Sequence, residues 1–129
     1  MGRNVFVSFA VEDRPLVESV LEQLGRRQII SPDDNVLIDY DPGALGSTFR
    51  DSAREALTDA DTVVVIWSRA AALSNWVNYE LGMADALGKR LITVLLKDAS
   101  PELPSNLQQT ESVELAIPSR KAPGTFTRG

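Results

Sequence analysis

One glutamate, Glu80, follows a tryptophan by four residues inside a stretch whose apolar side chains recur at helical spacing. Residues four apart lie one above the other on a helix, so Trp76 and Glu80 share a face. The four residues after Glu80 carry no charge, and a carboxylate beside an indole and apolar side chains loses solvation, which tends to raise its pKa. Perturbed acids gather at working sites, so Glu80 is the candidate catalytic residue. The alternative is a solvated Glu80 on a helix whose Trp76 belongs to the core.

Composition limits the chemistry that can surround this acid. The chain contains no cysteine and no histidine, which removes disulfides, thiolate chemistry, Ser-His-Asp triads and the commonest zinc ligand. Asp39 and Asp41 could hold Mg²⁺ as a pair, but in a turn they more often cap the backbone, so we predict no metal. The net charge is −5 and the thirteen basic residues are scattered, which argues against a nucleic-acid partner.

Cofactor motifs are also missing. Neither GxxxxGK[ST] nor GxGxxG occurs, and residues 8–13 contain no glycine, so a bound flavin or dinucleotide cofactor is not predicted. A phospho-acceptor receiver domain needs an aspartate where Trp67 and Ser68 stand. A lone glutamate cannot supply both carboxyls of ordinary glycoside hydrolysis. It suffices where the leaving group needs no proton, as when cationic nicotinamide leaves NAD⁺ as a neutral ring and a carboxylate stabilises the oxocarbenium-like ribose. Cleavage of NAD⁺ is therefore one reaction that a single carboxylate could support.

The elements that must position Glu80 alternate between strand and helix patterns. Strands are predicted over Asn4–Phe9, Val36–Ile38, Thr62–Trp67, Arg90–Leu96 and Ser112–Ile117. Helices are predicted from Asp13 as N-cap to Gly25 as stop, from Ser47 or Thr48 onward, and from Ser74 as N-cap to Leu87. This alternation predicts a three-layer, flavodoxin-like α/β fold, with a five-stranded parallel sheet in the order 2-1-3-4-5 flanked by helices.

Such a sheet binds ligands where its winding direction reverses, here between the first and third strands. The predicted crevice is lined by residues 8–11 and by the segment after Trp67, from which the helix of Glu80 grows. The predicted fold therefore places Glu80 near the crevice, and this reason is independent of its spacing from Trp76.

The chain of 129 residues, 43% of them apolar, suits one domain, which we place at residues 1–117. Residues 118–129 are rich in proline, glycine and basic residues and are predicted to be a flexible tail or a linker to a missing domain. No apolar run reaches the roughly 20 residues that span a bilayer, and no signal peptide precedes the first strand. We therefore expect a cytoplasmic location and no membrane partner.

Four short segments together resemble a known family. They are Val5–Phe9, Asp41–Gly43 in the long loop after the second strand, Val63–Ser68, and Ser74–Leu81 with its Trp-x-x-x-Glu pattern. Their order and spacing are similar to those of a Toll/interleukin-1 receptor (TIR) domain of the bacterial, NAD-cleaving type. By this resemblance Glu80 is catalytic, and the substrate-binding residues are Ser8, Phe9, Trp76 and Leu45, with Phe9 against the nicotinamide and Leu45 in a mobile loop. Asp41, Pro42 and Gly43 form the loop that contacts a neighbouring subunit.

The resemblance implies an NAD⁺ glycohydrolase or cyclase that releases nicotinamide with ADP-ribose or a cyclic isomer. Such enzymes typically work as homo-oligomers through TIR–TIR contacts, and bacterial members commonly serve in anti-phage defence signalling. A fused or associated sensor domain is a further partner that would fit this role. Two departures are Ala10 and Val11, where many active members carry a basic residue, and the poor helix pattern after Pro118, where the family ends in a helix. Two alternatives stay open: a non-catalytic TIR module that scaffolds partners through Pro42 and Gly43, and a nucleoside deoxyribosyltransferase-like enzyme.

Overall fold

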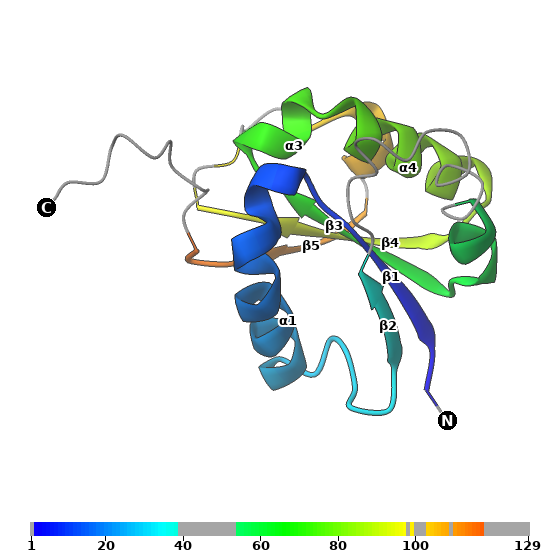
Figure 1. Ribbon diagram of the computed structural model, residues 1–129, viewed down its shortest axis with the longest axis vertical. Coiled ribbons are helices and arrows are strands. Elements are labelled where there is room, and N and C mark those ends of the chain that lie inside the picture. Colours follow the sequence, from blue (N-terminus) through cyan, green and yellow to red (C-terminus); the bar gives the residue numbers. More distant parts are fainter. Residues whose placement is uncertain (1, 39–53, 98, 100–102, 109, 118–129) are drawn as a thin grey trace, which may run out of the picture.

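A five-stranded sheet runs through the centre of the computed structural model, which describes residues 2–38, 54–97, 99, 103–108 and 110–117 (Figure 1). Its strands are β1 Asn4–Ser8, β2 Asn35–Ile38, β3 Thr62–Trp67, β4 Arg90–Leu95 and β5 Glu111–Glu114. They lie in the order β2-β1-β3-β4-β5, and every neighbouring pair is parallel. The predicted fold class and strand order are confirmed.

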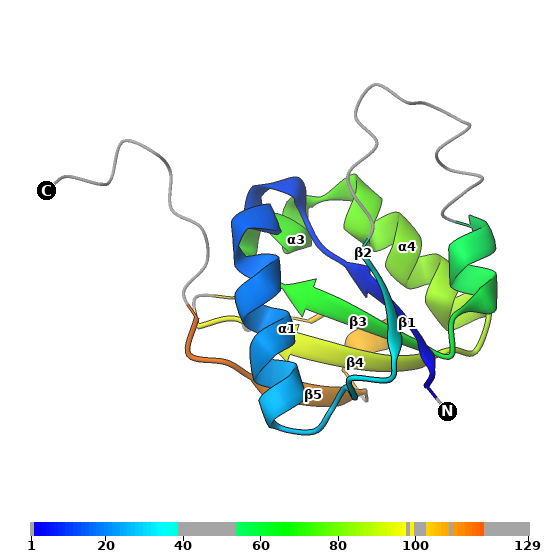
Figure 2. The ribbon, with the colours of Figure 1, turned by 60° about the horizontal axis from the view of Figure 1, so that its bottom comes forward.

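Helices cover both faces of the sheet (Figures 1 and 2). On one face lies α1 (Val17–Arg26), which is preceded by the 3-10 helix η1 (Val11–Leu16). On the other lie α3 (Arg69–Leu73), α4 (Asn75–Ala86) and the helical residues 54–59, and a second 3-10 helix, η2 (Ser105–Leu107), precedes β5. None of the helices in the described part of the chain is long and apolar enough to cross a membrane.

The pleat of the sheet divides the apolar core into two clusters. Val5 and Val7 of β1, with Phe9 directly after it, pack with the buried side chains of α1. Phe6 and Ala10 pack with those of α3, α4 and residues 54–60. Because successive side chains of a strand point to opposite faces, Ser8 lies on the α4 side. The last residue of β1 therefore presents a hydroxyl to α4.

The start and end of α1 differ from the sequence prediction. Asp13 does not cap this helix: it lies inside η1 and is buried, whereas the residue before α1 is Leu16, which makes no side-chain cap. Gly25 is not the stop, because it lies inside α1. Gln28 takes the left-handed conformation (φ 63°) that ends the helix, and the Ile29 N–H donates to the Leu24 carbonyl at 2.9 Å.

Other boundaries shift as well. β2 begins one residue earlier than predicted, at Asn35, and its residues alternate between exposed and half-buried. α4 ends at Ala86, one residue earlier than predicted, and Leu87 after it is 44% exposed. β1 and β4 end one residue earlier than predicted, whereas β5 begins at Glu111 and ends at Glu114. Predictions for residues 39–53 and 118–129, including the caps Ser47 and Thr48, lie outside the described residues.

Candidate active site

The helix that carries Glu80 begins where the sequence places it. The Ser74 side chain accepts a hydrogen bond from the Val77 N–H at 3.1 Å, which satisfies one free donor of the first turn. Val77, Leu81 and Ala84 are buried on the inward face of α4. Glu80 is buried on the same helix, so the carboxylate points into the molecule rather than to solvent.

Glu80 and Ser8 meet at the carboxyl end of β1. The Glu80 side chain is 0% exposed, and its Oε1 accepts a hydrogen bond from the Ser8 Oγ at 2.6 Å. Ser8 is the last residue of β1 and pairs in register with Val65 of β3. The distance is typical of a hydroxyl that donates to a carboxylate. The structure therefore places an acid at the point where the sheet reverses its winding direction, which is where this type of fold binds ligands.

Two opposing effects act on the charge of Glu80. Complete burial disfavours the ionised form, because the carboxylate loses its hydration. The Ser8 hydroxyl favours that form by donating to it. A negative charge held in this way is desolvated and fixed in direction, which is the condition under which it stabilises a developing positive charge most effectively.

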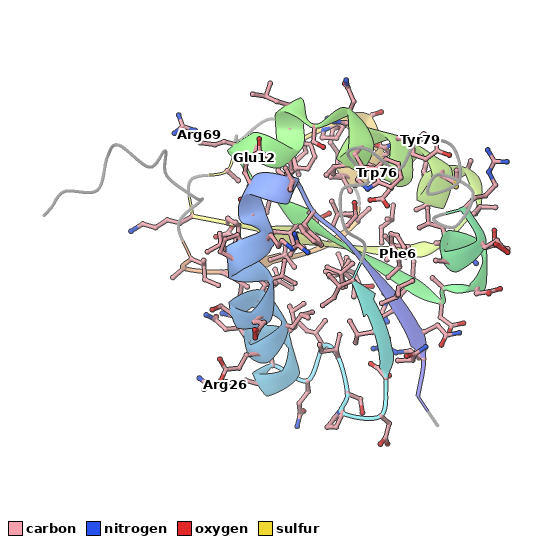
Figure 3. The ribbon with its side chains drawn as sticks, in the orientation of Figure 1. Phe6, Glu12, Arg26, Arg69, Trp76 and Tyr79 are labelled. Carbon is pink, nitrogen blue, oxygen red and sulfur yellow. The ribbon has the colours of Figure 1, made fainter. Side chains whose placement is uncertain are left out.

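A hollow of about 440 Å³ opens beside this helix between η1, α3 and α4. Its lining consists of Val11, Glu12, Ala70, Leu73, Ser74, Asn75, Trp76 and Tyr79. Trp76 and Tyr79 stack with ring centroids 5.6 Å apart and planes at 25° (Figure 3). A stacked aromatic pair at the edge of a hollow suits a planar ring of a ligand. A larger hollow, about 590 Å³, lies at the ends of β4 and β5, and none of the predicted site residues lines it.

A second buried acid, Asp13, lies at the same end of the sheet and was not predicted from the sequence as a site residue. The Ser68 Oγ donates a hydrogen bond to the Asp13 Oδ2, and both side chains are buried. Ser68 follows β3 directly and caps α3, because its Oγ accepts from the Ala71 N–H at 3.0 Å. The signal in the sequence was a serine after a strand followed by helix-forming residues, and it was overlooked because α3 has only five residues.

The other predicted site residues are placed as follows. The Phe9 ring is buried in the cluster on the α1 side, so the structure does not bring it to the face of Glu80. Leu45, Asp41, Pro42 and Gly43 lie outside the described residues. Within the described part of the chain, no group of three or more carboxylates gathers as a metal site would require. The sequence-predicted residues that the structure brings together are thus Ser8 and Glu80, with Trp76 one helical turn away.

The clearest pKa shifts lie at the amino ends of the strands, away from Glu80. Hydrogen bonds from the Arg3 backbone N–H, the Ser31 N–H and the Arg3 side chain lower the pKa of Asp34 to about 2. The Arg90 Nε donates a hydrogen bond to the Glu111 Oε2 at 2.6 Å. This bond lowers the pKa of Glu111 and raises the pKa of Arg90. These pairs join the amino ends of the strands and belong to the stability of the fold, not to the site.

Comparisons with known proteins agree with the fold. The family model described as "TIR domain" matches residues 5–123. Among solved structures, the TIR domain of the Toll-related receptor TRR-2 from Hydra magnipapillata is similar at 20% identity and a TM-score of 0.60, covering 84% of this chain and 82% of that one. No match was found among curated proteins.

Two enzymes share the fold. A 2-desoxiribosyltransferase from Leishmania mexicana matches at 23% identity and a TM-score of 0.53, covering 72% of this chain, which spans 64% of the transferase. The CMP N-glycosidase BcmB from Clostridium botulinum matches at 14% identity and a TM-score of 0.55, covering 88% of each chain. At such low identity these two likenesses describe the fold alone.

Proposed function

The chain belongs to the TIR domain family, and from this membership we propose that it is an NAD⁺ nucleosidase in which Glu80 acts on the ribose as nicotinamide departs. The observation that carries the proposal is the buried bond between the Ser8 Oγ and the Glu80 Oε1 at 2.6 Å. It supports a fixed negative charge at the switch point of the sheet, where a substrate would bind.

In the proposed reaction, the bond between the ribose C1′ and the nicotinamide nitrogen breaks. The bonding electron pair goes to the pyridinium ring, which leaves neutral, and positive charge develops on the ribose. The Glu80 carboxylate stabilises that charge, and Ser8 holds the carboxylate in direction. Water then adds to C1′ and loses a proton to give ADP-ribose, or a nucleophile of the same molecule adds to give a cyclic isomer. Trp76 and Tyr79 would hold a planar ring of the substrate in the hollow beside α4.

The test is nicotinamide release from NAD⁺, with the products identified by mass. Because the proposal includes assembly, the protein is measured at high concentration and under crowding. Glu80→Gln keeps the shape of the side chain and removes its charge, so we expect a loss of at least about a hundredfold in rate, in the range of electrostatic catalytic groups. Glu18→Gln, on the exposed face of α1, is the matched control and should leave the rate unchanged. A Glu80→Gln variant as active as the parent would overturn the proposal.

A second candidate is an enzyme that cleaves or exchanges the N-glycosidic bond of a nucleoside or nucleotide. The fold likeness to the transferase and to the CMP N-glycosidase favours it. The same carboxylate would serve, since these reactions also build positive charge on a sugar. A panel of deoxynucleosides, CMP and NAD⁺, followed by base release, separates the two. Turnover of a nucleoside without nicotinamide release from NAD⁺ would select this second candidate.

A third candidate is a TIR module that associates with other TIR domains and catalyses nothing. It predicts no turnover of any member of the panel at any protein concentration, together with loss of association in Pro42 variants. In the proposal made here, homo-oligomeric association and catalysis go together, in a cytoplasmic role in bacterial anti-phage defence signalling. The proposed loop of Asp41, Pro42 and Gly43 makes the contact, and Leu45 covers the substrate.

A further inference from the structure

Two hydrogen bonds cross the crevice between β1 and β3 in opposite directions. Ser8, at the end of β1, donates to Glu80, which lies on the helix after β3. Ser68, directly after β3, donates to Asp13, which lies in η1 after β1. A serine at or directly after the carboxyl end of each strand thus donates to an acid that follows the other strand in the chain. The first bond involves the proposed catalytic residue, whereas the second has no role in the reaction described above.

The second bond is built into the interior. Asp13 is 1% exposed and Ser68 is 0% exposed. The Asp13 backbone N–H donates to the Ala10 carbonyl at 2.8 Å, which fixes the residue within the first turn of η1. The Ser68 hydroxyl has two functions at once, because it donates to Asp13 and accepts from the Ala71 N–H. The bond therefore joins η1 to the first turn of α3.

Both of these elements line the aromatic hollow. Val11 and Glu12, immediately before Asp13, form the wall that η1 contributes. Ala70 and Leu73 form the wall that α3 contributes, and Figure 3 shows Glu12 and the α3 residue Arg69 on the same side of the molecule as Trp76. A helix of five residues is too short to be stable alone, so the position of α3 depends on its tertiary bonds. Leu73 at the end of α3 is 86% exposed and contributes little packing to hold it.

We propose that Asp13 is a positioning residue that, through Ser68, holds the two walls of this hollow at a fixed separation and thereby sets the affinity for the substrate. The proposal rests on the proposed function only in taking the hollow as the substrate site. In the proposed reaction Glu80 acts on the ribose, whereas Asp13 acts through Ser68. Loss of the bond should therefore raise KM and leave kcat nearly unchanged.

The first measurement is independent of catalysis. Trp67 is 2% exposed, so quenching of tryptophan fluorescence by acrylamide reports mainly on Trp76, in the hollow. Asp13→Ala should increase this quenching in a protein that keeps its circular dichroism spectrum. Thr93→Val is the matched control, because it removes another buried hydroxyl, bonded to Thr110 at 3.0 Å on β4, away from the hollow. Thr93→Val should lower stability without changing the quenching. Equal quenching in the two variants would overturn the proposal.

The second measurement is kinetic, with NAD⁺ as the substrate. Asp13→Ala should raise KM by about tenfold, the equivalent of ~1.4 kcal/mol, with kcat within about twofold of the parent. Ser68→Ala should give at least as large a rise, because it also removes the acceptor for the Ala71 N–H. The double variant should be no worse than Ser68→Ala, because the bond between Asp13 and Ser68 is lost only once. Asp13→Asn keeps an acceptor for Ser68 and should restore most of the affinity. A fall in kcat at constant KM, or additive effects in the double variant, would contradict the proposal.

The outcomes also separate this proposal from the proposed function. If the parent releases no nicotinamide from NAD⁺, the proposed function fails, and the fluorescence comparison alone decides the role of Asp13. If the parent is active and Asp13→Ala behaves like Thr93→Val in both measurements, the proposed function stands and the role of Asp13 is refuted. If Asp13→Ala does not fold, Ser68→Ala takes its place, because it removes the same bond from the other side.

Discussion

Glu80 and Asp13 show at the residue scale how a buried acid acquires a partner. Each carboxylate accepts from a serine that stands at the end of a central strand, 72 residues away for Glu80 and 55 residues away for Asp13. A buried carboxylate without such a donor would be strongly destabilising. The two serines therefore help to keep two acids in the interior, at the carboxyl end of the strands where ligands bind.

The sequence indicated the acid on α4 but not its partner. The spacing between Trp76 and Glu80 is local, so it predicted a shared helix face, and the uncharged neighbours of Glu80 predicted burial. The bond to Ser8 depends on how β1 and α4 pack, which no local pattern records. The same reason explains the wrong prediction for Asp13, since an aspartate two residues before a proline is typical of a helix start. The observed stacking partner of Trp76 is Tyr79, three residues on and equally visible in the sequence.

Asp34 gives a pH-dependent prediction at the same scale. Its pKa is lowered from 3.8 to about 2, chiefly by the Arg3 backbone N–H, then by the Ser31 N–H and the Arg3 side chain. Because the folded pKa lies below the unfolded one, the stabilisation is complete above about pH 4 and is lost as pH falls towards about 2. Asp34→Asn should therefore unfold at lower urea concentration than the parent at pH 7. The difference should shrink as pH falls through this window.

Urea denaturation at a series of pH values measures this effect. Asp33→Asn, at the exposed neighbouring position, is the control and should follow the parent throughout. The comparison cancels the contribution of Glu111, whose pKa is also lowered, by its hydrogen bond from Arg90. A difference between Asp34→Asn and the parent that persists unchanged to pH 2 would show that the charge of Asp34 is not the source of its stabilisation.

At the scale of elements, the two helices beside the hollow depend on a single residue between them. Ser74 ends α3 and caps α4, so the chain turns between the helices without a loop. The sequence predicted α4 because Ser74 and the apolar spacing agree over three turns. It did not predict α3, because five residues span little more than one turn and give no readable period. Short capped elements of this kind depend on tertiary contacts, which the sequence does not display locally.

The cap on α4 makes a prediction about stability. Ser74→Ala removes the acceptor for the Val77 N–H, which lies at 3.1 Å, and should destabilise the protein by about 1 kcal/mol. For a domain of this size the melting temperature should fall by about 4 °C. Ser74→Asp keeps an acceptor at the start of the helix and should melt close to the parent. Thermal unfolding followed by circular dichroism measures all three proteins. A Ser74→Ala variant as stable as the parent would mean that the first turn of α4 is held by packing alone.

At the scale of the whole molecule, the strand order was predictable because it follows from simple alternation. Strand and helix patterns repeat along the chain, parallel strands need helical crossovers, and those crossovers have one hand. The fold does not determine the reaction, as the likeness of this chain to a receptor domain, a transferase and a glycosidase shows. The family match sets the class of domain, and the site residues have to support the chemistry.

Assembly is the property for which the whole molecule gives the sharpest test. In the proposal, the loop of Asp41, Pro42 and Gly43 contacts a neighbouring subunit, so the site is completed by association. The rate of nicotinamide release per molecule should then rise with protein concentration, whereas a self-sufficient monomer would give a constant value. Pro42→Ala should shift both association and activity to higher concentration while leaving the melting temperature within about 2 °C of the parent, if its role is in association alone. Pro32→Ala, at an exposed turn after α1, is the matched control. Light scattering measures association and nicotinamide release measures activity, both on the same samples. A rate per molecule that stays constant while association changes would refute the role of assembly in catalysis.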